Sequence, residues 1–142
     1  EIVNYFTDQK VKMYSHQTLG SNESPQAYFT HPNENAYLKP VYVYTSDHTV
    51  SAAETFVMAM KALPNVIHVG DTTRGAFSDI LDKTLPNGWE IGLSNMFYWD
   101  KDGNSWEGKG LTPDQEFSVF SRGEIFDSHL DATEHLIQLL KK

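Results

Sequence analysis

A serine and a glutamate three residues apart, Ser51 and Glu54, lie where a strand-like run gives way to a helix-like one. A serine at such a junction lies beside helix-start N–H groups that lack intrahelical acceptors, at the positive end of the helix dipole, which suits a developing oxyanion. Ser51 is therefore a candidate nucleophile. The same spacing is also that of a capping box, in which the hydroxyl and the carboxylate each accept a hydrogen bond from a helix-start N–H. These residues alone leave both interpretations open.

The elements around Ser51 can be predicted from hydrophobic patterns. Val41–Tyr44 is β-branched and aromatic, which predicts a buried strand. Ala52–Leu63 has apolar residues at three- and four-residue spacing and stops before a proline, which predicts a helix. Val66–Gly70 predicts a second buried strand, and Asp71–Ala76 a loop at its carboxyl end, where α/β folds place their sites. Strand, helix and strand within about 30 residues indicate a right-handed βαβ crossover and a parallel sheet.

Turn signals organise the second half of the chain. Ile80–Leu85 and Trp89–Leu93 flank Pro86-Asn87-Gly88 and predict a β-hairpin. Asp100–Gly103 predicts another turn after Met96–Trp99. Calcium binding is not expected in that turn, because its glycine comes two positions too early for an EF-hand loop and no glutamate stands at position 12.

The remaining segments complete the predicted organisation. Ile2–Phe6 resembles the end of a helix, and Lys10–Ser15 predicts a short strand. Leu19–Lys39, rich in Gly, Ser, Asn and Pro, predicts a loop. Leu130–Leu140 has an apolar face and predicts a terminal helix. The chain opens on Glu1 without an initiator methionine, so we expect it to be a piece of a longer protein.

Composition limits the classes of function. The 142 residues are 39% apolar and 21% charged, as expected for one globular domain or part of one. The net charge of −8 and the lack of a basic patch disfavour binding to nucleic acid or anionic lipid. The chain has no cysteine, which excludes disulfides, thiolate catalysis and cysteine-ligated zinc. No apolar run approaches the roughly 20 residues of a membrane-spanning helix.

Six short motifs, in this order, resemble those of one family: the C-terminal-processing, or tail-specific, serine peptidases, with their tricorn and interphotoreceptor retinoid-binding relatives. The motifs are Pro40-Val41-Tyr42-Val43-Tyr44, Thr49-Val50-Ser51-Ala52-Ala53-Glu54, Val69-Gly70-Asp71-Thr72-Thr73-Arg74-Gly75, Leu85-Pro86-Asn87-Gly88, Tyr98-Trp99-Asp100-Lys101-Asp102-Gly103 and Gly110-Leu111-Thr112-Pro113-Asp114. The resemblance extends from about Val11 to the end of the chain. It implies that residues 1–142 form the C-terminal half of a catalytic domain of α/β class, with a ClpP/crotonase-like core, a βαβ unit and β-hairpins.

The resemblance also implies roles for individual residues. In this family the serine of the T-x-S-x-x-E motif attacks the peptide carbonyl, and the next backbone N–H supplies half of the oxyanion hole. Here these are Ser51 and Ala52. A second oxyanion donor would come from a segment before Glu1. Arg74 and Gly75 are candidates for substrate binding, since the Arg74 guanidinium suits a substrate carboxylate.

The catalytic base distinguishes two branches of the family. Members of the Ser–Lys type carry a lysine directly after the glycine of the T-x-G motif, where this chain has Ala76, so a Ser–Lys dyad is not expected. Tricorn-like members use a histidine that is oriented by a glutamate before the G-x-x-P-D turn, and Glu107 fits that role. Such a carboxylate fixes the tautomer of the imidazole and stabilises its cation. Family histidines sit upstream of this chain's start, so the base is expected to precede Glu1.

The histidines within the chain are weaker candidates for the base. His48 remains a candidate because it lies three residues before Ser51, although it would sit in the same turn. His68 alternates with apolar residues of a predicted strand and is expected to be packed. The others are expected in or beside a loop, or on the terminal helix: His16, His31, His129 and His135.

The predicted function is that of a serine endopeptidase that forms an acyl-enzyme on Ser51 and uses no metal or organic cofactor. Its substrate would be a polypeptide, and the family resemblance favours the cell envelope, the periplasm or secretion. One alternative is a non-catalytic, retinoid-binding-like module for an apolar ligand, and another is a degenerate peptidase kept as a scaffold. Aromatic residues would suit the binding module: Tyr42, Tyr44, Phe77, Phe97, Tyr98 and Trp99. The isolated chain would expose apolar surface, so a homo-oligomer is also predicted.

Overall fold

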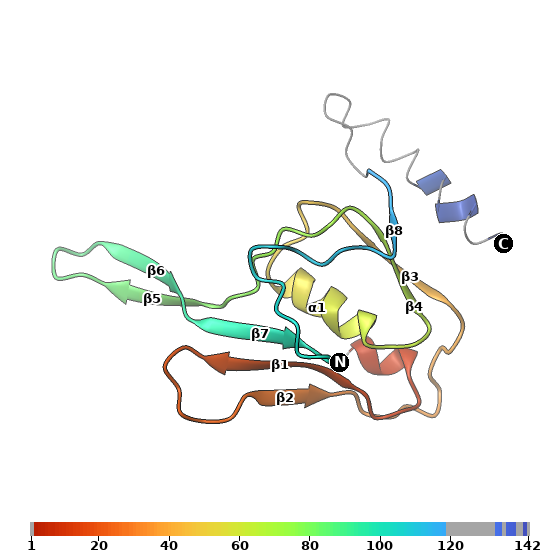
Figure 1. The fold of residues 1–142 in the computed structure, drawn as a ribbon, viewed down its shortest axis with the longest axis horizontal. Helices are drawn as coiled ribbons and strands as arrows, with labels where there is room; N and C mark the ends of the chain where they lie inside the picture. The colour runs from red at the N-terminus through yellow and green to blue at the C-terminus, as the bar shows by residue number, and fades with distance from the viewer. Residues whose placement is uncertain (1, 119–132, 135, 139–140, 142) are drawn as a thin grey trace.

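The computed structural model describes residues 2–118, 133–134, 136–138 and 141. Its central unit consists of β3 (Val41–Thr45), α1 (Ala52–Lys61) and β4 (Val66–Gly70). β3 and β4 pair in parallel along their whole length. The short strand β8 (Gln115–Glu116) pairs in parallel with the other edge of β4. The predicted βαβ unit and parallel sheet are therefore confirmed (Figure 1).

Helix α1 forms where the apolar spacing predicted it, because one face of the helix is buried in the core. Val57 and Met60 are buried on that face, and Leu63 follows them just after the helix ends. The helix stops at Lys61, two residues earlier than predicted, since the chain must leave the helical conformation before Pro64. Figure 1 shows α1 between the sheet of β3 and β4 and a second sheet.

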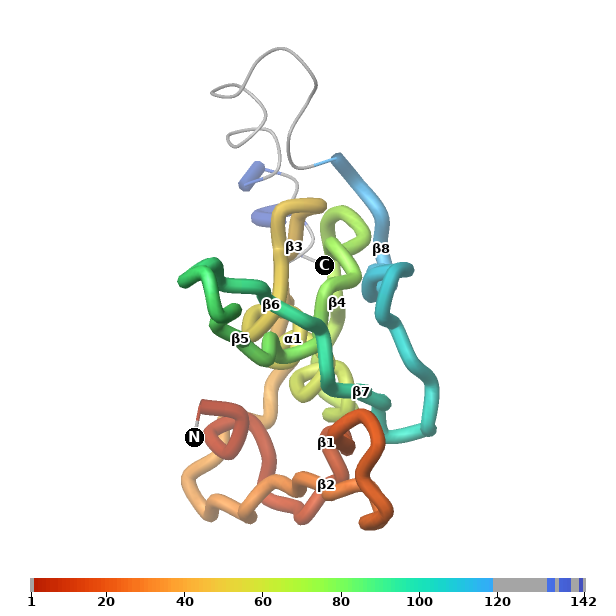
Figure 2. The backbone as a smooth tube through the Cα atoms, turned by 90° about the vertical axis from the view of Figure 1, so that its left-hand side faces the viewer, coloured from red at the N-terminus to blue at the C-terminus, as the bar shows by residue number. Residues whose placement is uncertain are grey.

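The second sheet is antiparallel, with the strand order β2 (Gln26–Phe29), β1 (Lys12–Thr18) and β7 (Met96–Asp100). Figure 2 shows β1 and β2 on the opposite side of α1 from β3, β4 and β8. Strand β1 confirms the prediction of a strand that begins near Lys10, although it runs three residues beyond Ser15. These two sheets enclose α1 and the buried core.

The prediction of a continuous loop over Leu19–Lys39 is wrong, because β2 lies within it. Three of its four residues are exposed, so β2 buries no face that a periodic sequence pattern would mark, and its apolar residues, Ala27–Phe29, are few within a segment rich in Gly, Ser, Asn and Pro. It is held instead by its pairing with β1 and by aromatic contacts. The ring of Tyr28 stacks on Tyr14 at 4.9 Å and on His16 at 5.1 Å between centroids.

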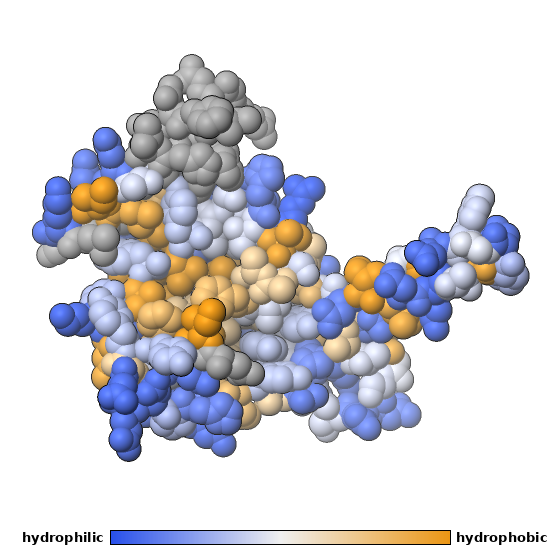
Figure 3. Space-filling view, turned by 180° about the vertical axis from the view of Figure 1, so that it is seen from behind, coloured by the Kyte–Doolittle hydropathy of each residue, from blue (hydrophilic) through white to orange (hydrophobic). Residues whose placement is uncertain are grey.

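The predicted hairpin is present as β5 (Ile80–Thr84) and β6 (Glu90–Ser94), which pair antiparallel. We call this hairpin, with its turn Leu85–Trp89, the arm. Every residue of both strands is exposed. Figures 1 and 3 show the arm extending away from the body of the molecule.

The two ends of the chain carry short helical segments. Ile2–Phe6 is a 3₁₀ helix, in agreement with the predicted helix end. In the terminal segment residues 133–134 and 136–138 are helical, whereas Leu130 and Leu140 of the predicted apolar face lie outside the described residues. No helix in the described part of the chain has the length and hydrophobicity to cross a membrane.

Candidate active site

Ser51 occupies the tight turn between β3 and α1, where it is the N-cap of the helix. Its backbone φ of 58° and ψ of −124° make it the one non-glycine residue with positive φ among those described. Such a conformation is costly for a residue with a Cβ and persists only where surrounding contacts impose it, which occurs most often at functional sites. The turn leaves Ser51 exposed at the surface.

The capping-box arrangement of Ser51 and Glu54 is present, but only its carboxylate half forms a hydrogen bond. Ser51 N–H donates to Glu54 Oε2 at 3.2 Å. The Ser51 hydroxyl makes no capping hydrogen bond. The two interpretations of this motif are thus compatible, since Glu54 serves the helix start while the hydroxyl stays available for chemistry.

Glu54 is fully buried, and its carboxylate organises the site. Oε1 accepts hydrogen bonds from Thr73 Oγ1 and Gly75 N, both at 2.6 Å, and Oε2 accepts from Ala76 N at 2.8 Å in addition to Ser51 N. A buried charge needs such partners to offset its lost hydration. The sequence identified Glu54 only as a cap, because its three further donors lie about 20 residues along the chain.

The loop that supplies these donors is also fixed by backbone contacts. Arg74 N–H donates to Thr49 O at 2.9 Å, and Gly75 O accepts from Gly108 N at 2.7 Å. Gly75 has a φ of +80°, and a Cβ there would lie 2.6 Å from Gly110 N. The position therefore requires glycine on structural grounds.

Glu107 lies on the other side of this loop. Its Oε2 accepts hydrogen bonds from Phe77 N at 2.9 Å and Ser78 N at 3.0 Å, whereas Oε1 has no partner among the described residues. The carbonyl of Ala76, the residue before Phe77, accepts a backbone hydrogen bond from Ser51 N at 3.1 Å. Ser51 and Glu107 are thus both hydrogen-bonded to the backbone of segment 76–78. Through this segment the structure brings the two predicted residues to the same part of the molecule.

The other predicted site residues lie around Ser51. Ala52 N–H, the first amide of α1, has no acceptor within the described residues, as expected at a helix start. The Arg74 side chain is exposed and forms no ion pair with a described residue. A developing negative charge above Ser51 would therefore meet an unoccupied N–H donor, with a cationic side chain on the neighbouring loop.

The turn at Asp100 supports the segment that carries Glu107. Its carboxylate accepts hydrogen bonds from Asn104 N at 2.8 Å and from Trp106 Nε1 at 2.9 Å, next to Glu107. Burial alone would raise the pKa of Asp100, but these and neighbouring hydrogen bonds outweigh it and hold the pKa below its ordinary value. The described residues contain no group of three His, Cys, Asp or Glu side chains that could hold a metal ion.

The histidines described by the structure lie in different surroundings. His48 is exposed, with its Nδ1 2.7 Å from Asp47 Oδ1. His68 is fully buried and its two ring nitrogens contact Thr45 and Lys61, which confirms the prediction of a packed histidine. His16 lies in β1 rather than in the loop, and its Nε2 is 2.7 Å from Tyr28 Oη. Two further histidines lie outside the described residues: His129 and His135.

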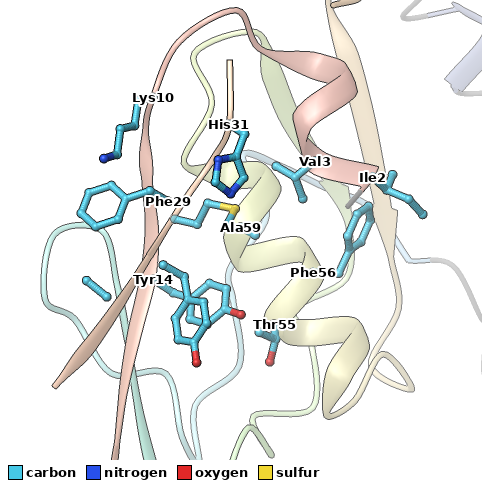
Figure 4. A pocket seen from close by; sticks show the side chains of 12 residues that line it. Ile2, Val3, Lys10, Tyr14, Phe29, His31, Thr55, Phe56 and Ala59 are labelled. Carbon is cyan, nitrogen blue, oxygen red and sulfur yellow. The ribbon is translucent and has the colours of Figure 1, made fainter. Parts of the chain in front are cut away.

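An open apolar groove of about 580 Å³ lies between α1, the 3₁₀ helix and the sheet of β1 and β2. Figure 4 shows Phe56 and Thr55 of α1 facing it, opposite Tyr14 and Phe29. None of the six aromatic residues proposed from the sequence for an apolar ligand lines this groove. Phe77, for example, is buried in the core.

Comparison with known proteins decides the family. Residues 1–117 match the profile of Peptidase family S41. The chain belongs to this family. The resemblance to C-terminal-processing peptidases inferred from the sequence is therefore confirmed. As a family S41 member, the chain is a mixed α/β fragment whose parallel βαβ sheet and hairpins match part of the catalytic domains of such peptidases.

Three solved structures illustrate the match. A protein of Parabacteroides merdae described as a candidate peptidase is 26% identical, with a TM-score of 0.78 over 95% of this chain. The photosystem II D1 C-terminal processing protease is 18% identical, with a TM-score of 0.67 over 82% of this chain. Mature CPAF is 13% identical, with a TM-score of 0.82 over 98% of this chain, and these last two show the fold alone. The chain spans 45%, 30% and 40% of these structures, respectively.

Proposed function

We propose that this chain supplies the C-terminal half of a serine peptidase catalytic domain with a ClpP/crotonase-like core, and that Ser51 is its nucleophile. The observation that carries the proposal is the turn at Ser51. Ser51 has a positive φ, its N–H donates to the buried Glu54 carboxylate, and its side chain is exposed next to Ala52, whose N–H has no acceptor among the described residues. Family membership implies a polypeptide substrate.

In the proposed reaction Ser51 Oγ attacks the carbonyl carbon of the scissile peptide bond and transfers its proton to a histidine that precedes Glu1. The carbonyl oxygen becomes an oxyanion, and Ala52 N–H donates a hydrogen bond to it. The C–N bond then breaks, the imidazolium protonates the leaving amine, and an ester remains on Ser51. A water molecule, deprotonated by the same histidine, hydrolyses this ester and restores the hydroxyl.

Glu107 would orient that histidine. Because two backbone amides hold its Oε2, the carboxylate has a fixed orientation with Oε1 open to accept a hydrogen bond from an imidazole Nδ1–H. A carboxylate in this position fixes the tautomer that leaves Nε2 free to accept the serine proton. Its place across segment 76–78 from Ser51 fits this role.

Arg74 would contribute to substrate recognition. Its backbone N–H is held by Thr49 O, while its guanidinium is exposed and without an ion-pair partner among the described residues. An arginine can bind a carboxylate through two parallel hydrogen bonds. We therefore assign it a substrate carboxylate as ligand, and Gly75 the role of keeping the loop close to Ser51.

The test is mass spectrometry of the complete protein after treatment with a fluorophosphonate, which reacts with activated serines. We expect one adduct, at Ser51, and none in Ser51→Ala, while the exposed-loop control Ser24→Ala labels like the wild type. Glu107→Gln should slow labelling, because an amide orients an imidazole less well than a carboxylate. An unlabelled complete protein that is correctly folded would overturn the proposal.

A second candidate function is binding of an apolar ligand, and the groove in Figure 4 is the observation that favours it. Its volume of about 580 Å³ falls within the range of small-molecule sites. A ligand that binds stoichiometrically to the complete protein, in the absence of fluorophosphonate labelling, would support this function. A complete protein with neither property would fit the degenerate scaffold.

A further inference from the structure

A buried polar chain runs from α1 to the loop of the candidate active site, and the proposed reaction does not use it. Its central members are His68 on β4 and Thr45 on β3, which are 0% and 2% exposed. His68 Nε2 lies 2.7 Å from Thr45 Oγ1, and His68 Nδ1 lies 3.2 Å from Lys61 Nζ. Thr45 Oγ1 in turn donates to Asp71 O at 2.7 Å.

The donor and acceptor chemistry of these groups determines which atom donates in each hydrogen bond of the polar chain. An ammonium group can only donate, so Nδ1 of His68 accepts from Lys61 and the ring proton lies on Nε2. Nε2–H then donates to Thr45 Oγ1, whose own hydroxyl proton is directed to the Asp71 carbonyl. Three successive hydrogen bonds thus lead from Lys61 to the backbone of Asp71. This order of donors and acceptors requires a neutral His68, because a protonated imidazole could not accept a hydrogen bond at Nδ1.

Two charged side chains, Lys61 and Asp114, face His68, and burial together with Lys61 keeps it neutral. Burial, and then the Lys61 ammonium from α1, lower the pKa of His68 to about 4, against the opposing effects of the Asp114 carboxylate and the Thr112 carbonyl. Lys61 is held in place because Nζ also donates to Asp114 Oδ1 at 3.1 Å, and Asp114 Oδ2 accepts from His68 N at 2.8 Å.

Thr45 holds the first residue of the active-site loop from two sides. Its hydroxyl donates to Asp71 O, and its backbone carbonyl accepts from Asp71 N at 3.0 Å. Gly70, the residue before Asp71, has a φ of +111°, and a Cβ at this position would lie 2.1 Å from Thr45 O. The direction in which the loop leaves β4 is therefore set at Thr45, and this loop carries Thr73 and its neighbours to Glu54.

We propose that His68 and Thr45 are positioning residues for Ser51: their hydrogen-bonded chain sets the start of the loop whose donors hold Glu54, and Glu54 holds the Ser51 turn. The proposal rests on the proposed function only in taking Ser51 as the nucleophile. Neither residue touches the substrate. Small displacements of a nucleophile reduce rates steeply, and a shift on the order of 1 Å costs roughly 100-fold.

The test compares Thr45→Val, which removes the hydroxyl at nearly constant volume, with Thr45→Ser, which retains it. Val43→Ala is the matched control, since it removes buried volume from the same face of β3, in register with His68, but removes no donor or acceptor of the polar chain. At His68, Gln can still donate an amide N–H towards Thr45, whereas Leu cannot. The measurements on the complete protein are the rate of fluorophosphonate labelling and amide hydrogen exchange in Asp71–Ala76.

We expect Thr45→Val and His68→Leu to label roughly 10- to 100-fold more slowly and to exchange faster in Asp71–Ala76. Thr45→Ser, His68→Gln and Val43→Ala should stay within a few-fold of the wild type. Equal behaviour of Thr45→Val and Val43→Ala in both measurements would overturn the proposal. If the wild type itself does not label, the proposed function fails, and the exchange comparison still decides whether the polar chain holds the loop.

Discussion

The carboxylate of Glu54 determines the site at the scale of single residues, because it joins the turn at Ser51 to the loop of residues 73–76. Its partners are the turn at Ser51, the hydroxyl of Thr73 and the amides of Gly75 and Ala76. Thr73 and Gly75 are buried, where an unsatisfied donor is costly. The same side chain therefore stabilises the fold and holds the turn at Ser51.

Glu54→Gln should lower both stability and reactivity. The amide keeps the shape of the side chain but presents an N–H₂ group to donors that now lack an acceptor. We expect a loss of roughly 2–4 kcal/mol in the free energy of unfolding, measured by urea denaturation, and strongly reduced labelling of Ser51. Glu90→Gln, on the exposed strand β6, is the control and should change neither quantity. A Glu54→Gln protein of wild-type stability would contradict the role of this carboxylate.

The backbone of Ser51 makes a separate prediction. At a φ of 58° and ψ of −124°, a residue with a Cβ is strained and glycine is not. Ser51→Gly should therefore be more stable than Ser51→Ala by about 1–2 kcal/mol, although both variants lose the hydroxyl and should be unreactive. Thermal unfolding of the two proteins side by side measures the difference, and equal melting temperatures would show that the turn is unstrained.

At the scale of elements, the strands and the helix near Ser51 were predictable because each buries a periodic apolar face. Val41–Thr45, α1 and Val66–Gly70 appear within about two residues of their predicted bounds. Strand β2 was missed, since its exposed side chains carry no such pattern and its pairing with β1 is a tertiary contact. The positions of Ser51 and Glu107 followed from family motifs, but the bonds that join them through segment 76–78 depend on long-range folding.

The close approach of the loop after β4 to the segment before β8 can be tested with two glycines. Gly110 has a φ of +77°, and a Cβ there would lie 2.0 Å from Thr73 O. Gly103 has a similar φ of +89° with nothing within 4 Å. Because backbone strain is common to both, Gly110→Ala should cost roughly 2–4 kcal/mol more in unfolding free energy than Gly103→Ala. Similar costs in urea denaturation would mean that the two segments separate easily.

At the scale of the whole molecule, His68 couples stability to pH. Its pKa is 6.5 when unfolded and about 4 when folded, so between these values the unfolded chain binds more protons. The free energy of unfolding should therefore fall as the pH decreases from 6.5 to 4, by roughly 3 kcal/mol, and this contribution should be fully lost below pH 4. Urea denaturation across the window measures it.

His68→Gln is the direct comparison, because it removes the titrating group and should flatten this part of the pH profile. Asp114 acts in a different window. Burial would raise its pKa, but hydrogen bonds from His68 N–H and Lys61 hold it lower, so its contribution is lost only as the pH falls below about 3.8. Equal slopes for His68→Gln and the wild type between pH 6.5 and 4 would refute the assignment.

The exposed apolar surface of the arm predicts self-association of the isolated chain. Leu81, Ile91 and Leu93 share one face of the arm and are 39%, 40% and 50% exposed. Contiguous exposed apolar residues favour association. Sedimentation velocity at micromolar concentration should detect dimers or larger species, and Ile91→Ser with Leu93→Ser should reduce them. A wild-type chain that sediments as a clean monomer would contradict this prediction.

The arm also makes the molecule convenient for single-molecule work. Its tip is closed by its own backbone, from Leu85 N to Trp89 O at 2.7 Å and from Gly88 N to Leu85 O at 2.8 Å, and Pro86 is exposed there. Because the sequence contains no cysteine, Pro86→Cys would introduce a unique thiol. A dye or a surface tether attached at that thiol would lie at the end of the arm, away from α1 (Figure 1), so it would leave the candidate active site uncovered.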